Sequence, residues 1–215
     1  MKYHFLEWLR DNVIEELGNR GSPWNARLLV VPKKRIENEP QRYRVCVDLR
    51  HVNKCASIDL SPFAPFSIQE TFHLLGRAKI FSTIDLTQAF CSIPIFKDHQ
   101  FKTAFSFNGA RYCFIKTPFG LSSAPAALGK CLNRALKNVP RSFCIPYMDD
   151  LIIFSPNPLS HFRHIKIVLG ALLLAGLKIS LPKCKFFRTS LEFLGHLIQE
   201  GQYSLIREYV QPVLD

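Results

Sequence analysis

Two adjacent aspartates, Asp149 and Asp150, stand between two short apolar runs at residues 145–148 and 151–154. A third acid, Asp85, ends another apolar run that is typical of a strand. Acids inside apolar strands cost free energy unless a cation or hydrogen bonds offset their desolvation. Close carboxylates repel one another and favour protonation, whereas a divalent cation reverses that preference. The fold must therefore give these acids solvent, hydrogen-bond donors or a metal.

Each acid also has a plainer explanation when it is taken alone. The Asp149–Asp150 pair suits a solvated hairpin turn, and Asp85 suits the cap of a following helix. As a set, carboxylate oxygens suit Mg²⁺ or Mn²⁺ rather than zinc. Two such ions about 4 Å apart can activate a hydroxyl and neutralise a leaving pyrophosphate. The surrounding sequence has to decide between these interpretations.

The composition indicates a folded, basic chain. Its 215 residues carry 28 Lys and Arg against 17 Asp and Glu, a net charge of +11, and 47% are hydrophobic, which excludes disorder. The excess charge favours a polyanion as partner, with nucleic acid first and an acidic membrane surface second. The longest apolar run, residues 167–177, is shorter than the roughly 20 residues of a spanning helix, so the chain is not expected to span a membrane. Of the two polyanions, nucleic acid is the expected partner and a membrane is not. Seven cysteines without a Cys-x-x-Cys pair predict reduced, mostly buried thiols.

The residue pattern predicts an α+β fold in which hairpins are segregated from helices. The dipeptide Asn108–Gly109 is a strong hairpin signal. His161 and His164, spaced for one helix face, are expected on a solvated face rather than at a metal. Helices are predicted at residues 1–18, 67–75, 122–136 and 160–177, the last burying Ile165, Val168, Leu169, Leu172 and Leu173. Strands are predicted at residues 26–31, 43–49, 79–86, 101–107, 111–116, 144–147, 151–154 and 191–198.

Five motifs follow one another along the chain, at residues 44–54, 81–86, 117–126, 147–150 and 193–196. The fourth, Tyr147-Met148-Asp149-Asp150, matches a Tyr-x-Asp-Asp box between apolar strands. In content and order the five resemble the reverse transcriptases of retroviruses and gypsy-type LTR retrotransposons. The resemblance covers about residues 22 to 200 and identifies a family rather than a particular element.

The resemblance implies a role for each matching residue. Asp85, Asp149 and Asp150 are the catalytic acids that bind two Mg²⁺ ions, with Mn²⁺ as a substitute, and Leu86 offers its backbone carbonyl. Lys33 and Arg44 grip the triphosphate, although solvated loop charges explain them too. Phe90 screens the sugar 2′ position, unless it is plain core. The rest of the implied nucleotide pocket is Phe119, Gly120 and Met148, and the implied primer and template contacts are Tyr147, Leu194, Gly195 and His196.

The implied architecture is a right-hand polymerase with fingers at about 1–60 and 93–123 and palm at about 61–92 and 124–215. The palm is expected to be an antiparallel sheet backed by helices, the thumb is expected to be absent, and no ribonuclease H, protease or integrase module is expected in the chain. The implied activity is RNA-directed and DNA-directed DNA polymerisation from dNTPs on a primed template. The alternative is a catalytically silent nucleic-acid-binding remnant or a host-adopted retroelement protein. Oligomeric state and localisation are left open.

Overall fold

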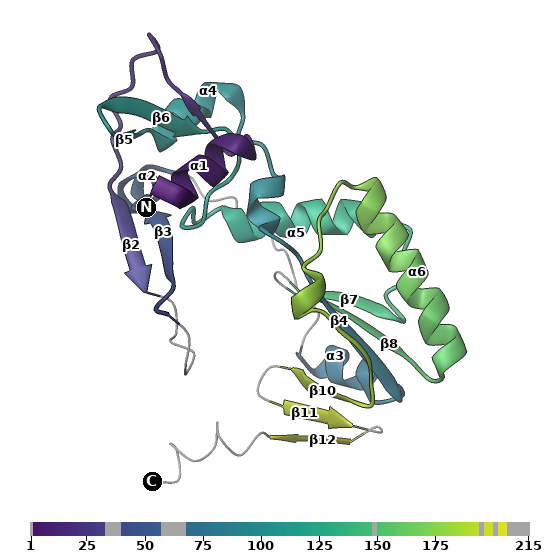
Figure 1. Ribbon diagram of the computed structural model, residues 1–215. Helices are drawn as coiled ribbons and strands as arrows, with labels where there is room; N and C mark the ends of the chain where they lie inside the picture. Colours follow the sequence, from purple (N-terminus) through teal and green to yellow (C-terminus); the bar gives the residue numbers. More distant parts are fainter. Residues whose placement is uncertain are drawn as a thin grey trace. The chain divides into compact units, whose positions relative to one another are not determined.

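The computed structural model describes residues 2–32, 40–56, 68–147, 150–193, 196–199 and 202–205. The chain divides into two compact units, each formed from two stretches of sequence. The first comprises Met1–Ser61 and Phe90–Leu128, and the second comprises Pro62–Ala89 and Gly129–Asp215. Both combine helices with antiparallel sheets, so the α+β class is confirmed (Figure 1).

The first unit contains two small antiparallel sheets. In one, β1 (Ile14–Glu16) and β5 (Phe105–Phe107) flank β6 (Ala110–Phe114); in the other, β2 (Leu28–Pro32) pairs with β3 (Tyr43–Val47). The predicted hairpin is confirmed, because Asn108 and Gly109 have φ of 49° and 81°, as a tight two-residue turn requires. The helical segments are α1 (Lys2–Arg10), α2 (Arg50–Cys55), η1 (Ala89–Ser92), α4 (Lys97–Gln100) and η2 (Phe101–Thr103).

The predicted helix over residues 1–18 is wrong beyond Arg10. Asn12 has a φ of 50°, which reverses the chain, and Ile14 then pairs with Phe114 in a strand. Apolar residues at this spacing serve a helix or a strand equally well, and the pairing with β6 decides between them. Burial supports the outcome, since Val13 and Ile14 join the aromatic core around Phe105.

The second unit is built on a four-stranded antiparallel sheet with strand order β7-β8-β4-β9. The chain supplies β4 (Ile80–Asp85), β7 (Cys144–Tyr147), β8 (Asp150–Ser155) and β9 (Lys185–Arg188). A second sheet has the order β10-β11-β12, formed by Ser190–Phe193, His196–Gln199 and Gln202–Leu205. The helices are α3 (Ile68–Leu75), α6 (Pro158–Leu174) and η3 (Leu181–Lys183), while α5 (Ala124–Ala135) crosses the division between the units.

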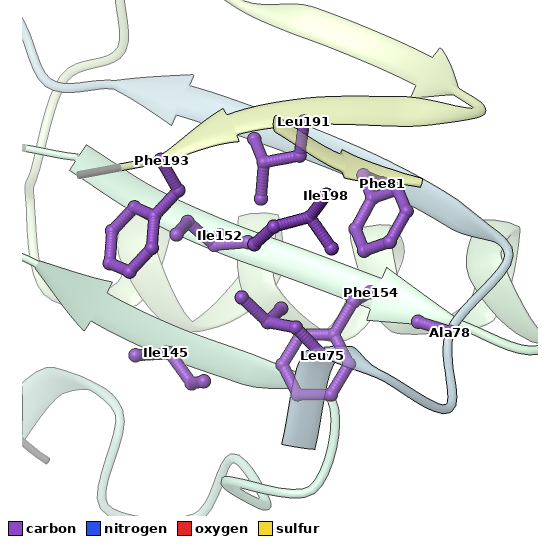
Figure 2. Close-up of a cluster of buried hydrophobic side chains, with 9 residues drawn as sticks. All are labelled: Leu75, Ala78, Phe81, Ile145, Ile152, Phe154, Leu191, Phe193 and Ile198. Atoms are coloured by element: carbon purple, nitrogen blue, oxygen red, sulfur yellow. The ribbon is translucent and has the colours of Figure 1, made fainter. Parts of the chain in front are cut away.

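Strand β8 is covered on both faces, which explains its uninterrupted apolar sequence. Ile152 and Phe154 join a cluster with residues of α3, β10 and β11 (Figure 2). The alternate residues face the other way, where Ser155 bonds to α6. Polar groups on this strand are therefore left to its ends, and Asp150 is its exposed first residue.

Several smaller predictions are wrong. Leu173, expected in the core, is 79% exposed, because α6 buries the row His161, Ile165, Val168 and Leu172 instead. Only Cys113 and Cys144 of the seven cysteines are buried. Residues 101–103 form the 3₁₀ turn η2 rather than strand, and β9 and α2 were not predicted. Among the described residues, every helix is too short or too polar to cross a bilayer.

Candidate active site

Two of the three predicted catalytic acids lie opposite each other. Asp85 is the last residue of β4 and Asp150 the first of β8, and the antiparallel register pairs them directly. Directly opposed residues point to the same face, with Cβ atoms about 5 Å apart. The Asp85 side chain is 24% exposed and Asp150 is exposed, so both acids lie at an open end of the sheet.

The acids line a groove of about 470 Å³ whose other charges are mostly basic. Lys183, Lys185 and Arg188 share its wall with Asp85 and Asp150. The Lys183 Nζ donates to both carboxylate oxygens of Asp85, at 3.3 Å each. The sequence offers no local signal for this contact, because the partners are 98 residues apart.

The donor set fits a hard divalent cation. Asp85 and Asp150 present carboxylate oxygens from two rigid central strands, and oxygen ligands are those that Mg²⁺ prefers. Leu86 is buried and forms a β-bridge with Ile179. The two backbone hydrogen bonds beside this bridge use the Asp85 carbonyl and the Thr87 amide, and neither of them uses the Leu86 carbonyl. Within the described residues no three His, Cys, Asp or Glu side chains form a metal-binding group.

The structure describes only part of the predicted site. Lys33, Met148, Asp149, Leu194 and Gly195 lie outside the described residues, as does the side chain of Tyr147. The Tyr147 backbone ends β7 and pairs with Asp150. His196 begins β11, where it is partly buried and pairs with Phe193.

The predicted nucleotide-pocket residues of the first unit include one contact pair. The rings of Phe90 and Phe119 meet edge to face, 5.3 Å between centroids. Gly120 has a φ of 100°, and a Cβ there would lie 3.4 Å from the Val47 carbonyl oxygen. Arg44 is exposed on β3, opposite Val31.

The Asn53 side chain forms hydrogen bonds with the turn that follows Phe119, a role that was not predicted from the sequence. Its amide nitrogen donates to the Gly120 carbonyl at 2.8 Å, and its amide oxygen accepts from the Ser122 backbone at 3.0 Å. Asn53 stands inside the motif at residues 44–54, so the motif was visible while its structural purpose was not. The turn is thereby held to α2 by side-chain bonds across the sequence.

A second groove, of about 800 Å³, lies on the first unit and is strongly basic. Trp24 and His51 line it with ring centroids 5.3 Å apart. Among the described residues that line it, the one acid is Asp48, which accepts bonds from Arg50, and these bonds lower the pKa of Asp48 to about 2. The remaining lining cations are Arg27, Lys54 and Lys102.

The second unit contains a buried polar chain that contradicts one prediction. His161 is fully buried rather than solvated: its Nε2 lies 2.7 Å from Ser82 Oγ and its Nδ1 2.8 Å from Ser155 Oγ. Ser155 Oγ also lies 2.7 Å from Nδ1 of His164, whose ring stacks on Phe143. Burial lowers the pKa of His161 to about 4 and also lowers that of His164. These hydrogen-bonded side chains link α6 to β4, which ends at Asp85, and to β8, which begins at Asp150.

Comparison with known proteins identifies the family of the chain. The family model described as reverse transcriptase (RNA-dependent DNA polymerase) matches residues 31–198. The chain is 36% identical over 194 residues to the retrovirus-related Pol polyprotein from transposon 297 of Drosophila melanogaster, covering 87% of this chain and 18% of the relative. It is 34% identical to the Pol polyprotein from transposon gypsy of the same organism, covering 95% of this chain and 20% of the relative.

Comparison with solved structures also finds a reverse transcriptase. The chain is similar to the foamy viral protease-reverse transcriptase in complex with RNA/DNA hybrid, with a TM-score of 0.79 and 28% identity over 98% of this chain and 27% of that one. The chain therefore belongs to the reverse transcriptase family. It spans about a fifth of the length of the curated relatives that it matches.

Proposed function

We propose that this chain is the fingers and palm of a retroelement reverse transcriptase and polymerises DNA on RNA and DNA templates. The observation that carries the proposal is the direct pairing of Asp85 with Asp150 at the open end of two central strands, in a chain of this family. In this assignment the first unit is the fingers and the second is the palm.

The catalytic centre consists of Asp85, Asp149, Asp150 and the Leu86 carbonyl, which would hold two Mg²⁺ ions, with Mn²⁺ as a substitute. When bound, these ions lower the pKa of the primer 3′-hydroxyl and neutralise charge on the departing pyrophosphate. The strands supply rigidity, because carboxylates fixed by a central sheet need little reorganisation during the reaction. The primer oxygen forms a bond to the α-phosphorus, the bond to the pyrophosphate oxygen breaks, and the hydroxyl proton passes to solvent.

We assign Lys33, Arg44, Phe90, Met148, Phe119 and Gly120 to nucleotide binding, as the family resemblance implies. An exposed Arg44 suits a triphosphate ligand, since a guanidinium binds phosphate oxygens in a bidentate manner. The Phe90–Phe119 edge-to-face contact supports a rigid wall against the sugar. Asn53 holds the turn through Gly120 and Ser122 and thus keeps Phe119 in position.

The template and primer are expected to bind mainly through phosphates. A net charge of +11 and the basic groove around Trp24 support a nucleic-acid partner. Tyr147, Leu194, Gly195 and His196 are assigned to the primer end. Base identity is read by pairing with the template, so little sequence preference by the protein is expected.

The decisive experiment is extension of a DNA primer on an RNA template with Mg²⁺ and dNTPs. Wild type is compared with Asp149→Asn and with a matched control, Asp98→Asn, which removes an exposed acid of α4. Incorporation that disappears only in Asp149→Asn is expected. Wild type that binds template–primer but extends nothing, even when the downstream polyprotein segment is supplied, favours the silent remnant instead.

A further inference from the structure

The contact between Lys183 and Asp85 is held in place by the backbone. Ser180 donates its amide to the Asp85 carbonyl at 2.9 Å, and Thr87 donates to the Lys178 carbonyl at 2.8 Å. Segment 178–180 thus runs alongside the end of β4, and η3 follows at once, with Lys183 donating to the Ser180 carbonyl at 2.9 Å. Hydrogen bonds of the backbone therefore fix the turn that carries Lys183 next to Asp85.

The bond occupies the oxygen atoms that a metal ion needs. Lys183 Nζ lies 3.3 Å from both Oδ1 and Oδ2 of Asp85, so it bridges the two oxygens at the position that a bidentate metal ion would take. A divalent ion and an ammonium on one carboxylate repel each other strongly at contact distance. Metal and lysine therefore compete for the bridging position on Asp85, and each weakens the binding of the other.

The lysine is able to leave. Its side chain is 68% exposed, against 24% for Asp85, so the stem can rotate into water while the carboxylate stays on the sheet. A lysine stem has several rotatable bonds and a well-hydrated head group. Lys185 and Arg188 line the same groove, so the displaced ammonium enters a basic environment that repels it outward.

We propose that Lys183 is a resident counter-cation of Asp85 that divalent metal must displace, and that it thereby sets the metal affinity of the site. The contact neutralises Asp85 in the metal-free protein and weakens binding of Mg²⁺ until the ammonium moves away. This inference rests on the proposed function, because it takes Asp85 as a metal ligand.

The test is a titration of Mg²⁺ into the 215-residue chain by calorimetry, without nucleotide or nucleic acid. Because exposed ion pairs are weak and the lost repulsion adds to them, Lys183→Gln should bind Mg²⁺ about twofold to tenfold more tightly. Lys183→Arg keeps the charge and should remain within about twofold of wild type. Lys185→Gln is the matched control, since it removes one charge from the same groove without touching the Asp85 bond.

A second readout follows the lysine itself. The side-chain NMR signals of Lys183 in wild type should shift on Mg²⁺ addition with the same midpoint as the calorimetric binding. Lys183 signals that do not move during Asp85-dependent binding contradict the proposal, as does unchanged affinity in Lys183→Gln or an equal gain in Lys185→Gln. If Asp85→Asn binds Mg²⁺ as well as wild type does, the metal site itself is misassigned and both proposals fall. If Asp85→Asn loses binding while Lys183→Gln binds Mg²⁺ as wild type does, the metal site stands and the role of Lys183 alone is refuted.

Discussion

Acidification should destabilise the second unit through His161. The imidazole is fully buried, and both ring nitrogens are engaged by Ser82 and Ser155. Burial, reinforced by the nearby His164, lowers the pKa of His161 from 6.5 to about 4. Protonation would give both nitrogens a hydrogen and place a charge where no carboxylate is among its hydrogen-bond partners.

Proton linkage gives the direction and the size of the change in the free energy of unfolding with pH. A histidine with a depressed native pKa binds a proton in the unfolded chain first, so stability is complete above pH 6.5 and falls between pH 6.5 and about 4. That shift corresponds to a loss of about 2 kcal/mol by pH 5 and about 3 kcal/mol by pH 4. Such a loss is a large part of the stability of a small domain.

Urea unfolding at pH 7, 6, 5 and 4.5 measures the effect. His161→Gln keeps polar groups for both serines but does not titrate; it should cost about 1–3 kcal/mol at pH 7 and flatten the dependence between pH 6.5 and 4.5. His73→Gln is the control, because His73 is exposed on α3. If His161→Gln retains the full wild-type pH dependence, the buried imidazole is not its source and the reasoning is refuted.

Three further outcomes are expected. Gly120→Ala should lower the free energy of unfolding by about 1–2 kcal/mol, because of its left-handed φ and the nearby Val47 carbonyl, whereas Gly21→Ala should be nearly neutral; equal effects would contradict this. Phe90→Ala should raise ribonucleotide relative to deoxynucleotide incorporation by about tenfold or more in primer extension, and an unchanged ratio would make Phe90 plain core. Replacing Arg27, Lys54 and Lys102 by Gln should reduce the log–log salt slope of template–primer binding by about 2 to 3, while replacing Lys137, Lys166 and Lys178 should leave it unchanged; an unaltered slope in the first variant would exclude the groove from phosphate contact.

Local signals predicted much of the fold because they act within a few residues. Asn108–Gly109 requires its turn through its own backbone preferences, and the apolar run of β8 reflects burial on both faces. Residues 13–17 were assigned to a helix because their apolar spacing suits a helix as well as a strand. Pairing with β6 makes the segment a strand. Sequence patterns predict the conformation where residues close in sequence determine it.

The site was predictable in its acids but not in its surroundings. Asp85 and Asp150 stand out as acids beside apolar strands, and the register then brings them together. Lys183 and Asn53 act across 98 and 67 residues, and no local pattern marks such partners. His161 was assigned to a solvated helix face together with His164. Its partner Ser82 lies 79 residues away on β4, and Ser155 lies on β8, so only the packing of α6 on these strands reveals the buried contact.

The central claim is that Asp85 and Asp150 act as one catalytic pair, and single-nucleotide incorporation at saturating primed template tests it most directly. Asp85→Asn and Asp150→Asn should each reduce the Mg²⁺-dependent rate by about a thousandfold or more, while the Kd for template–primer stays within about twofold of wild type. The double variant should lose little more than either single one, because groups that act as a unit are not additive. Rates near wild type in either single variant, with binding intact, would contradict the account.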